Sequence, residues 1–470
     1  MGAAMGALRR IRLRTRLWAH RAAYAVYFIF ILPDYSKHYF ASNFLHRLLF
    51  PFTSKFQDRH HKGSSIMSSP MLNSTERPWD GWLLLIVCAL LGIGVVMIYS
   101  ASGITATWLT GDSMFYLKRQ LIYMAVGLGF LIAGLKIDYR VYQRLAWPIF
   151  GGTVLLLILV LAIGTEVNGA QRWIRLGAFN IQPAEIAKIT LVFVLAYSMT
   201  KKNELMKTFV IGVLPHILLI GFVVLLLLKQ PDFGSSVIIV MMTGAMLAFS
   251  GMRMIYTISG LLLCGGAGFI LITSADYRMK RILAFMDPWG TQGDEGYQLT
   301  RSLISIGSGG LEGRGLGQGV GKLGFVPELH TDFIGTATLE ELGFAGALAL
   351  CLLFLAFATR GFLIAYRARD YFGRNVAFGL TFVITFQAML NLGVITGLLP
   401  TKGLTLPFVS FGGSSLLMCM FATGVLLNIS KCAPDSYEIK KSRIKAEKER
   451  IAWEKKRERI IRESQEDRIH

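Results

Sequence analysis

GKLGFVPELHTDFIGTATLEELG, from Gly321 to Gly343, runs without a break into FAGALALCLLFLAFAT, residues 344–359. The second part is an apolar block of the kind that crosses a bilayer, which takes about 20 mostly apolar residues per helix. Titratable groups at or inside such a helix are costly unless they have a partner or a function. The stretch therefore decides the fold class and also shows where to look for a site. Its titratable side chains are Lys322, Glu328, His330, Asp332, Glu340 and Glu341.

Apolar blocks of this kind recur along the chain, which has 470 residues and is 53% hydrophobic. They are too long for strands and lack the one-sided stripe of a soluble helix. We predict an all-α polytopic membrane protein with about ten transmembrane helices and one large extracytoplasmic loop between spans seven and eight. The predicted spans are 81–100, 121–136, 146–164, 184–200, 209–228, 234–250, 255–274, 333–359, 375–396 and 412–430.

The distribution of Lys and Arg predicts the orientation. With both termini in the cytoplasm, the short inner loops carry cations at a higher density than the outer loops, as the positive-inside rule requires. Much of the net charge of +20 lies in the two tails, where contact with an anionic inner leaflet explains it and no nucleic-acid partner is needed. The five cysteines form no CxxC pair, which indicates neither a disulfide framework nor a zinc site.

The predicted organisation has six parts. Residues 1–66 form a basic extension that is an interfacial helix, a targeting segment or sequence upstream of a start at Met67. Long loops that are rich in Gly and charge are candidates for function, which applies here to the loop before span eight. The remaining parts are a cytoplasmic lead at 67–80, spans one to seven at 81–274, the large loop at 275–332, spans eight to ten at 333–430, and a charged cytoplasmic tail at 431–470.

Two roles are open for Asp332, which stands where the chain re-enters the membrane. An Asp before an apolar helix can cap its free N–H groups and suits the positive end of the helix dipole. A carboxylate at a water–lipid boundary is also partly desolvated, which raises its pKa toward that of a useful general base. The two roles can coexist. Glu340 and Glu341, about two turns later, should face a cavity, find partners or stay protonated.

Two further clusters precede spans. In the segment Asn168–Leu191, Arg172 and Arg175 suit either an anion or lipid headgroups, and Glu185 and Lys188 have the spacing of a neutralising structural pair.

In Leu399–Leu417, Ser414 and Ser415 open a span near Lys402, which indicates either an anion site or helix capping. All of these clusters face outward in the predicted topology. Together they indicate a polar site at the outer leaflet, suited to a ligand with phosphate, hydroxyl-rich and lipid parts.

At these motifs the chain resembles the SEDS family (shape, elongation, division, sporulation) of polytopic peptidoglycan glycosyltransferases, from about Trp82 to Ile429. The motifs occur in the family's order, and FYLKRQ (Phe115–Gln120) and TKGLTLP resemble the cell-division branch more than the elongation branch. The other motifs are GAQRWIRLGAFNIQPAEIAK, DPW with GYQLTRSLISIGSGG, GLGQGVGKLGFVPELHTDF, EELGFAGAL and LPTKGLTLPFVSFGGSSLL.

The resemblance implies ten spans in the bacterial inner membrane and polymerisation of lipid II at the outer leaflet during septal synthesis. It also implies a class B penicillin-binding transpeptidase and other divisome membrane proteins as partners. It implies that Asp332 deprotonates the 4-hydroxyl of the acceptor sugar in an inverting displacement that releases undecaprenyl pyrophosphate. The charge of the leaving group then needs cations or a bound divalent ion; no other cofactor is implied. Our candidates for the substrate site are Arg172, Trp173, Lys322, Glu328, His330, Lys402, Ser414 and Ser415.

The chain departs from the family pattern at several positions. Gly335, Thr336 and Thr338 follow HTDF in place of an aliphatic or aromatic run, Phe411 replaces a usual Tyr, and Ala184 replaces a usual Ser. Two other functions are weighed: a lipid flippase also needs a polar cavity among its spans, and a divisome scaffold needs none. The inner loops carry no motif beyond simple cation clusters, which favours the enzyme.

Overall fold

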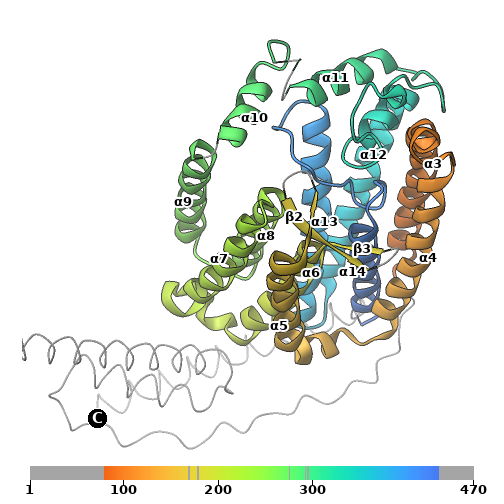
Figure 1. The fold of residues 1–470 in the computed structure, drawn as a ribbon. Helices are drawn as coiled ribbons and strands as arrows, with labels where there is room; N and C mark the ends of the chain where they lie inside the picture. Colours follow the sequence, from red (N-terminus) through yellow and green to blue (C-terminus); the bar gives the residue numbers. More distant parts are fainter. Residues whose placement is uncertain are drawn as a thin grey trace, which may run out of the picture. The chain divides into compact units, whose positions relative to one another are not determined.

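The computed structural model describes residues 79–432, apart from 168–169, 177–178, 275, 292 and 294–295 (Figure 1). The predicted extension at 1–66, most of the lead at 67–80 and nearly all of the tail at 431–470 lie outside the described residues. The helices are α3 (Gly81–Thr110), α4 (Phe115–Lys136), α5 (Tyr139–Ile163), α6 (Pro183–Lys201), α7 (Leu214–Lys229), α8 (Phe233–Phe249), α9 (Met254–Thr273), α10 (Asp276–Met286), α11 (Tyr297–Gly309), α12 (Ile334–Arg367), α13 (Tyr371–Ile395) and α14 (Gly413–Lys431), with short turns η1 (Asn203–Lys207), η2 (Phe209–Val213) and η3 (Gly321–Leu323).

Within the described part, eight helices are long and apolar enough to cross a membrane. They are α3, α4, α5, α6, η2 continued by α7, α12, α13 and α14. Two shorter apolar helices, α8 and the Met254–Ile270 part of α9, lie where the sixth and seventh spans are predicted. The polytopic helical architecture is therefore confirmed, and the count of ten spans stays a prediction.

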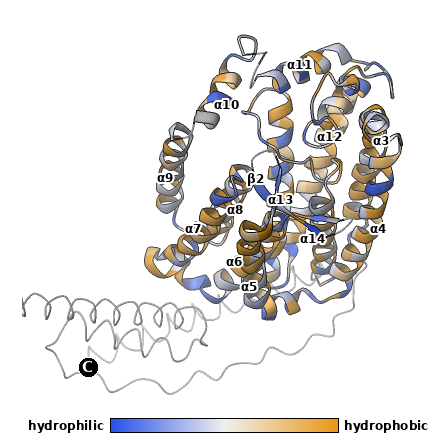
Figure 2. Ribbon diagram, in the orientation of Figure 1, coloured by the Kyte–Doolittle hydropathy of each residue, from blue (hydrophilic) through white to orange (hydrophobic). Residues whose placement is uncertain are grey.

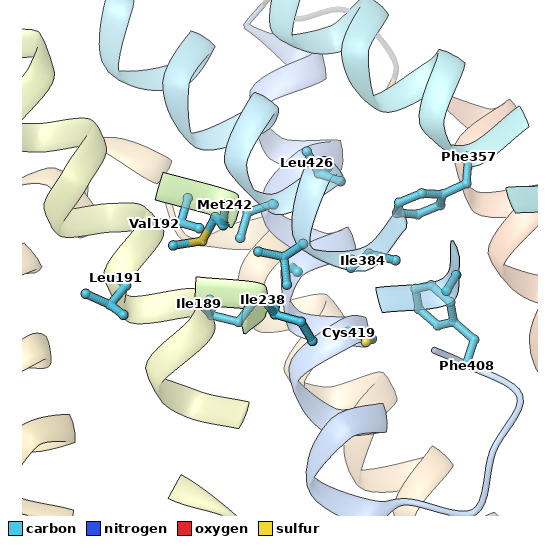
Figure 3. Close-up of a cluster of buried hydrophobic side chains, with 14 of the residues drawn as sticks. Ile189, Leu191, Val192, Ile238, Met242, Phe357, Ile384, Phe408, Cys419 and Leu426 are labelled. Carbon is cyan, nitrogen blue, oxygen red and sulfur yellow. The ribbon is translucent and has the colours of Figure 1, made fainter. Parts of the chain in front are cut away.

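Helices α6, α13 and α14 make the centre of the bundle. Nearly every residue of α6 is buried, whereas α3, α4, α5 and α7 expose many large apolar side chains, as lipid-facing helices do. Figure 2 shows the hydrophobic colouring that prevails along α4, α5 and α7. Figure 3 shows part of the core, in which Val192 of α6 lies close to Met242 of α8. The polar residues buried here are consequently inside protein and not in lipid.

Helices α4 and α14 pack unusually closely because glycine lines their contact. A Cβ at Gly134 would lie 2.7 Å from the carbonyl oxygen of Phe421, and one at Gly424 would lie 2.2 Å from that of Leu131. Small residues allow helix backbones to approach in this way in membranes. The contact fixes the last helix, and therefore the loop before it, against the rest of the bundle.

One feature was not predicted: a small sheet follows α5. Strands β1 (Thr165–Val167), β2 (Ala170–Leu176) and β3 (Phe179–Ile181) pair antiparallel in the order β1-β2-β3. The alternation of Trp173, Ile174 and Arg175 is too short to stand out among apolar blocks, which is why the sequence pattern missed it. Strand β2 carries Arg172 and Trp173.

Successive loops lie at opposite ends of the bundle, and long-range hydrogen bonds join the loops that share an end. At one end, the segments before α6, α8, α12 and α14 contact one another through side chains described below. At the other end, Arg360 pairs with Asp80 at 2.5 Å, and the amide of Asp80 donates to Ser430. This alternation is the arrangement expected of an up-and-down helical membrane protein, and it brings all the predicted clusters to one end.

Candidate active site

Asp332 lies immediately before α12, but it does not cap the helix. The N-cap residue is Phe333, and no side chain caps this end, so the capping interpretation of Asp332 is wrong. The backbone carbonyl of Asp332 accepts a hydrogen bond of 2.8 Å from Asn391 on α13. Its carboxylate forms no hydrogen bond or ion pair with any residue between 79 and 432 that the structure describes. The half-buried carboxylate is thus available to a ligand.

Burial raises the pKa of Asp332 from 3.8 to about 7. The negative charge of Glu328 adds to the rise, and the positive charges of Arg172 and Arg281 oppose it. A carboxyl group with a pKa near neutrality can take a proton from a hydroxyl and later return it to solvent. The expected desolvation at this position is therefore present, and its main cause is burial.

The loop between α13 and α14 brings Lys402 and Gly403 to Asp332. A Cβ at Gly403 would lie 3.0 Å from Asp332 Oδ2, so the backbone approaches the carboxylate closely. Lys402 is half-buried with its Nζ 5.0 Å from the centre of the Phe233 ring, and burial lowers its pKa. It has no carboxylate partner in the described part of the chain. A half-buried cation without a described counterion, one residue before the segment that approaches Asp332, is suited to an anionic ligand.

Arg172 is a second cation without a described carboxylate partner. Its guanidinium donates to the backbone carbonyls of Gln230, at 3.1 Å, and Pro231, in the turn between α7 and α8. No carboxylate among the described residues pairs with Arg172, and its charge acts on Asp332. The neighbouring Trp173 is half-buried and pairs through its backbone with Thr165. Arg281, on the basic helix α10, also acts on Asp332 and was not singled out in the sequence.

His330 packs in an aromatic cluster and is not hydrogen-bonded to Asp332 among the described contacts. Its ring lies 4.4 Å from that of Tyr116 and 5.9 Å from that of Phe411, between ring centres, and burial lowers its pKa. Phe411, where a Tyr is usual, therefore has a packing role. Glu328 is exposed with φ of 51°, and Thr331 donates to its carboxylate at 3.0 Å. These contacts shape the turn that presents Asp332.

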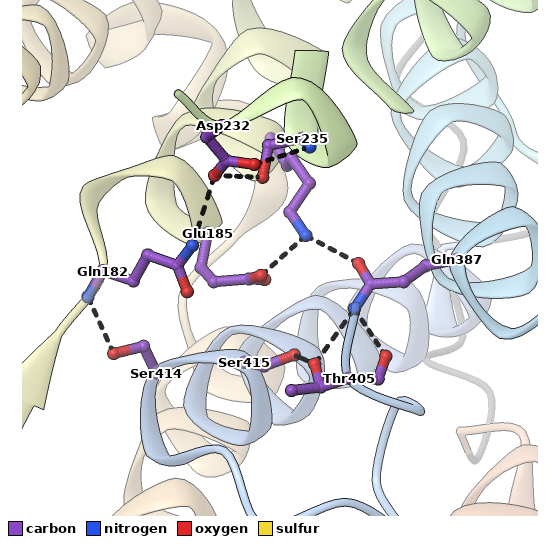
Figure 4. A network of polar contacts seen from close by, with 9 residues as sticks. Gln182, Glu185, Asp232, Ser235, Gln387, Thr405, Ser414 and Ser415 are labelled. Carbon is purple, nitrogen blue, oxygen red and sulfur yellow. Dashed lines mark hydrogen bonds and ion pairs between the residues drawn. The ribbon is translucent and has the colours of Figure 1, made fainter. Parts of the chain in front are cut away.

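Ser414 and Ser415 do not cap α14, whose N-cap is Gly412. Ser414 instead accepts from the amide of Gln182 at 3.0 Å and donates to the carbonyl of Asn180 at 2.8 Å. Ser415 accepts from Thr405 at 3.1 Å (Figure 4). Both hydroxyls therefore join loops of the site, and neither forms the expected anion site with a helix N-terminus.

Glu185 and Lys188 form a buried pair on α6. Lys188 Nζ lies 2.8 Å from Glu185 Oε1 and donates to Gln387 Oε1 at 2.6 Å. Gln387 extends this hydrogen-bond network, because its amide nitrogen donates to Thr405 (Figure 4). The pair thus supports the loop that carries Lys402.

Glu340 and Glu341 hold the Gly-rich loop against a break in α12. At Gly343, φ is 62° and the helix is interrupted. The freed carbonyls of Glu340 and Glu341 accept from the amides of Arg314 and Gly315 at 3.0 Å each. Their carboxylates accept from Val320 and Gly317, at 2.7 and 2.9 Å. The charged pair inside the eighth predicted span is thus satisfied by loop backbone and, at Glu341, also by the hydroxyl of Ser100 on α3, which donates at 2.6 Å.

Lys322 also takes part in the contacts between the Gly-rich loop and Glu341. Its Nζ lies 3.6 Å from Glu341 Oε1 and donates to the carbonyl of Gly317. Lys322 is therefore neutralised, unlike Lys402. Gly335, Thr336 and Thr338 are buried at the start of α12, where Thr336 bonds Ser302 at 2.6 Å, so these departures from the family pattern make specific contacts.

The structure thus brings Asp332, Lys402, Gly403 and Arg172 to one end of the bundle. The half-buried carboxylate can remove a proton from a hydroxyl, and the cations Arg172 and Lys402 at the same end can stabilise negative charge that develops elsewhere on the substrate. No group of three His, Cys, Asp or Glu side chains that could hold a metal ion occurs among the described residues.

Known proteins share this architecture. The family model described as "Cell cycle protein", which covers FtsW, RodA and SpoVE, matches residues 81–434. A probable peptidoglycan glycosyltransferase FtsW of Geobacter metallireducens is 44% identical over 361 residues, which are 76% of this chain and 96% of that protein. Another, of Pseudomonas fluorescens, is 42% identical over 367 residues, 77% and 90% of the two chains.

Two solved structures are also similar. A peptidoglycan synthase complex, described as coordinating polymerization and crosslinking, contains a chain with a TM-score of 0.63 at 28% identity, covering 75% of this chain and 98% of that one. The rod shape determining protein RodA of Thermus thermophilus has a TM-score of 0.56 at 28% identity, covering 76% and 98%. The match spans all the described helices and the small sheet, and the chain therefore belongs to the FtsW/RodA/SpoVE family, called SEDS above.

Proposed function

We propose that this multi-pass membrane protein is a peptidoglycan glycosyltransferase that polymerises lipid II at the outer leaflet, with Asp332 as the general base. The activity follows from the relatives, which are named as peptidoglycan glycosyltransferases. The observation that supports the role of Asp332 is its half-buried carboxylate, whose pKa is raised to about 7 and which forms no hydrogen bond or ion pair with another described side chain.

In the proposed reaction, Asp332 accepts the proton of the acceptor sugar's 4-hydroxyl. The hydroxyl oxygen attacks the anomeric carbon of the donor sugar and forms the new glycosidic bond. The bond from that carbon to the pyrophosphate oxygen breaks with inversion, and undecaprenyl pyrophosphate leaves with the bonding electrons. Lys402 and Arg172 stabilise the negative charge of the leaving group. Lys322 acts indirectly, because it is paired with Glu341.

The remaining assignments are also proposals. A chain of similar fold belongs to a complex that joins polymerization to crosslinking, which supports a class B penicillin-binding transpeptidase as partner. We place the protein in the bacterial inner membrane with both termini in the cytoplasm, at the division septum with other divisome proteins. The relatives named FtsW support the division branch.

The test is polymerisation of lipid II by the purified protein with its cognate transpeptidase. Asp332→Asn keeps the shape of the side chain but removes the base, and we expect loss of polymer by a factor of about 10² to 10⁴. The matched control is Asp112→Asn, because Asp112 is an exposed acid that pairs with Lys118 at 2.7 Å. Full activity of a folded Asp332→Asn variant would refute the proposed role and would return a flippase to consideration.

A further inference from the structure

Helix α13 buries two amides one turn apart, Gln387 and Asn391, in a helix that crosses the membrane. The two side chains are 2% and 1% exposed. Buried amides are stable only when their donors have acceptors. Here the acceptors lie on two loops of the active site, so α13 is linked directly to both loops.

Asn391 joins these loops to each other. Its Nδ2 donates to the carbonyl of Asp332 at 2.8 Å and to the carbonyl of Leu404 at 2.5 Å. One amide nitrogen therefore holds the residue that carries the base and a residue two positions after Lys402. With carbonyl oxygens as both acceptors, the nitrogen must point toward the loops.

Gln387 fixes the next residue of the same loop. Its Nε2 donates to the carbonyl of Thr405 at 3.0 Å and to Thr405 Oγ1 at 3.3 Å. Its Oε1 accepts from Lys188 at 2.6 Å, which sets the orientation of the amide (Figure 4). Successive carbonyls, those of Leu404 and Thr405, are thus bound by successive turns of α13.

The register of the loops determines where the carboxylate lies. A Cβ at Gly403 would lie 3.0 Å from Asp332 Oδ2, so a small shift of either loop changes the space around the carboxylate. Misplacement of a reacting group by about 1 Å can cost roughly 10²-fold in rate. We propose that Asn391 is the positioning residue of this enzyme, which sets the Asp332 carboxylate against the Lys402–Gly403 segment. This inference rests on the proposed role of Asp332 as the base.

The test compares two variants that keep the branch at Cγ, Asn391→Leu, which has no donor, and Asn391→Asp, which is nearly equal to Asn in volume and offers at most one proton to two carbonyls. The control is Asn428→Leu, because Asn428 is a buried amide of α14 that donates to the carbonyl of Leu135 at 2.8 Å at the other end of the bundle. Each full-length variant is assayed with its transpeptidase for kcat, for KM toward lipid II and for Tm.

We expect Asn391→Leu to lower kcat about 100-fold and Asn391→Asp to lower it less, with KM changed less than threefold in both. Asn428→Leu should lower Tm to a similar extent and leave kcat unchanged. If Asn391→Leu does not fold, Asn391→Asp is decisive by the same measurements. A folded Asn391 variant with the kcat of wild type, or one whose kcat falls no more than that of Asn428→Leu at equal loss of Tm, would overturn the inference.

A parallel Asp332→Asn variant separates this inference from the proposed function. Loss of polymer in Asp332→Asn together with normal kcat in Asn391→Leu would remove only the positioning role. Normal polymerisation by Asp332→Asn would remove the base itself, whatever the Asn391 variants do.

Discussion

The raised pKa of Asp332 predicts a steep pH dependence of polymerisation, because only the ionised carboxylate can accept a proton. With a pKa of about 7, about 9% of the group is ionised at pH 6 and about 91% at pH 8. The value of kcat should therefore rise about tenfold between these two pH values. With the ordinary pKa of 3.8, the group would be fully ionised at both, and kcat would not change.

A charge change near Asp332 should move this transition in a known direction. The charged groups that act on Asp332 are Glu328 in its own turn, Arg172 on β2 and Arg281 on α10. Glu328→Gln removes a negative charge that disfavours ionisation, so the pKa of Asp332 should fall. The rising limb of kcat then moves to lower pH, and the ratio of kcat at pH 8 to kcat at pH 6 falls below that of wild type.

The assay is the initial rate of glycan formation at saturating lipid II, from pH 5.5 to pH 8.5, with folding checked at each pH. Glu312→Gln is the matched control, since Glu312 is an exposed acid of the same segment between α11 and α12 and has no described effect on Asp332. A flat wild-type profile between pH 6 and pH 8 would refute a base with this pKa. An equal shift in both variants would refute the specific effect of Glu328.

Two further outcomes follow from the same geometry. Gly403→Ala should slow polymerisation roughly tenfold without lowering Tm, because its Cβ would lie 3.0 Å from Asp332 Oδ2. The control is Gly244→Ala, whose Cβ would meet no atom within 4 Å and which should leave the rate unchanged. Equal rates for the two variants would contradict the close approach of Gly403 to the carboxylate. Lys402→Gln should lower kcat about 10² to 10³-fold, as loss of a charge-stabilising donor does. Lys322→Gln should lower kcat less but should reduce Tm, since the substitution leaves Glu341 without its cation. The opposite order in kcat would show that Lys322 holds the leaving group.

The helical architecture could be predicted because each apolar block is long enough to identify a span by itself. Boundaries were less accurate where composition does not mark them. The helix α12 continues to Arg367, beyond the predicted end of the eighth span at 359, and it is interrupted at Gly343, which the apolar pattern did not indicate. The small sheet was missed because its strands are short and their pairing depends on contacts between separate segments.

At the site, the residue types could be predicted but their partners could not. Asp332, Lys402 and Arg172 stood out as charges near spans, and the structure gathers them at one end. Nothing local in the sequence indicates that Lys322 is neutralised by Glu341, because the partner lies 19 positions away. Gln387 and Asn391 carried a signal, two amides one turn apart in a predicted span, but their acceptors are backbone atoms of distant loops.

The central claim is that Asp332 carries out the proton transfer and does not merely hold the site together. A single-turnover measurement tests it most directly: wild type and Asp332→Asn are loaded with lipid II in complex with the transpeptidase, and bound lipid II and the first glycosidic bond are measured in the same samples. We predict equal amounts of bound lipid II and a rate of bond formation at least 100-fold lower in the variant. Bond formation at the wild-type rate, or loss of binding that accounts for the whole defect, would contradict the account.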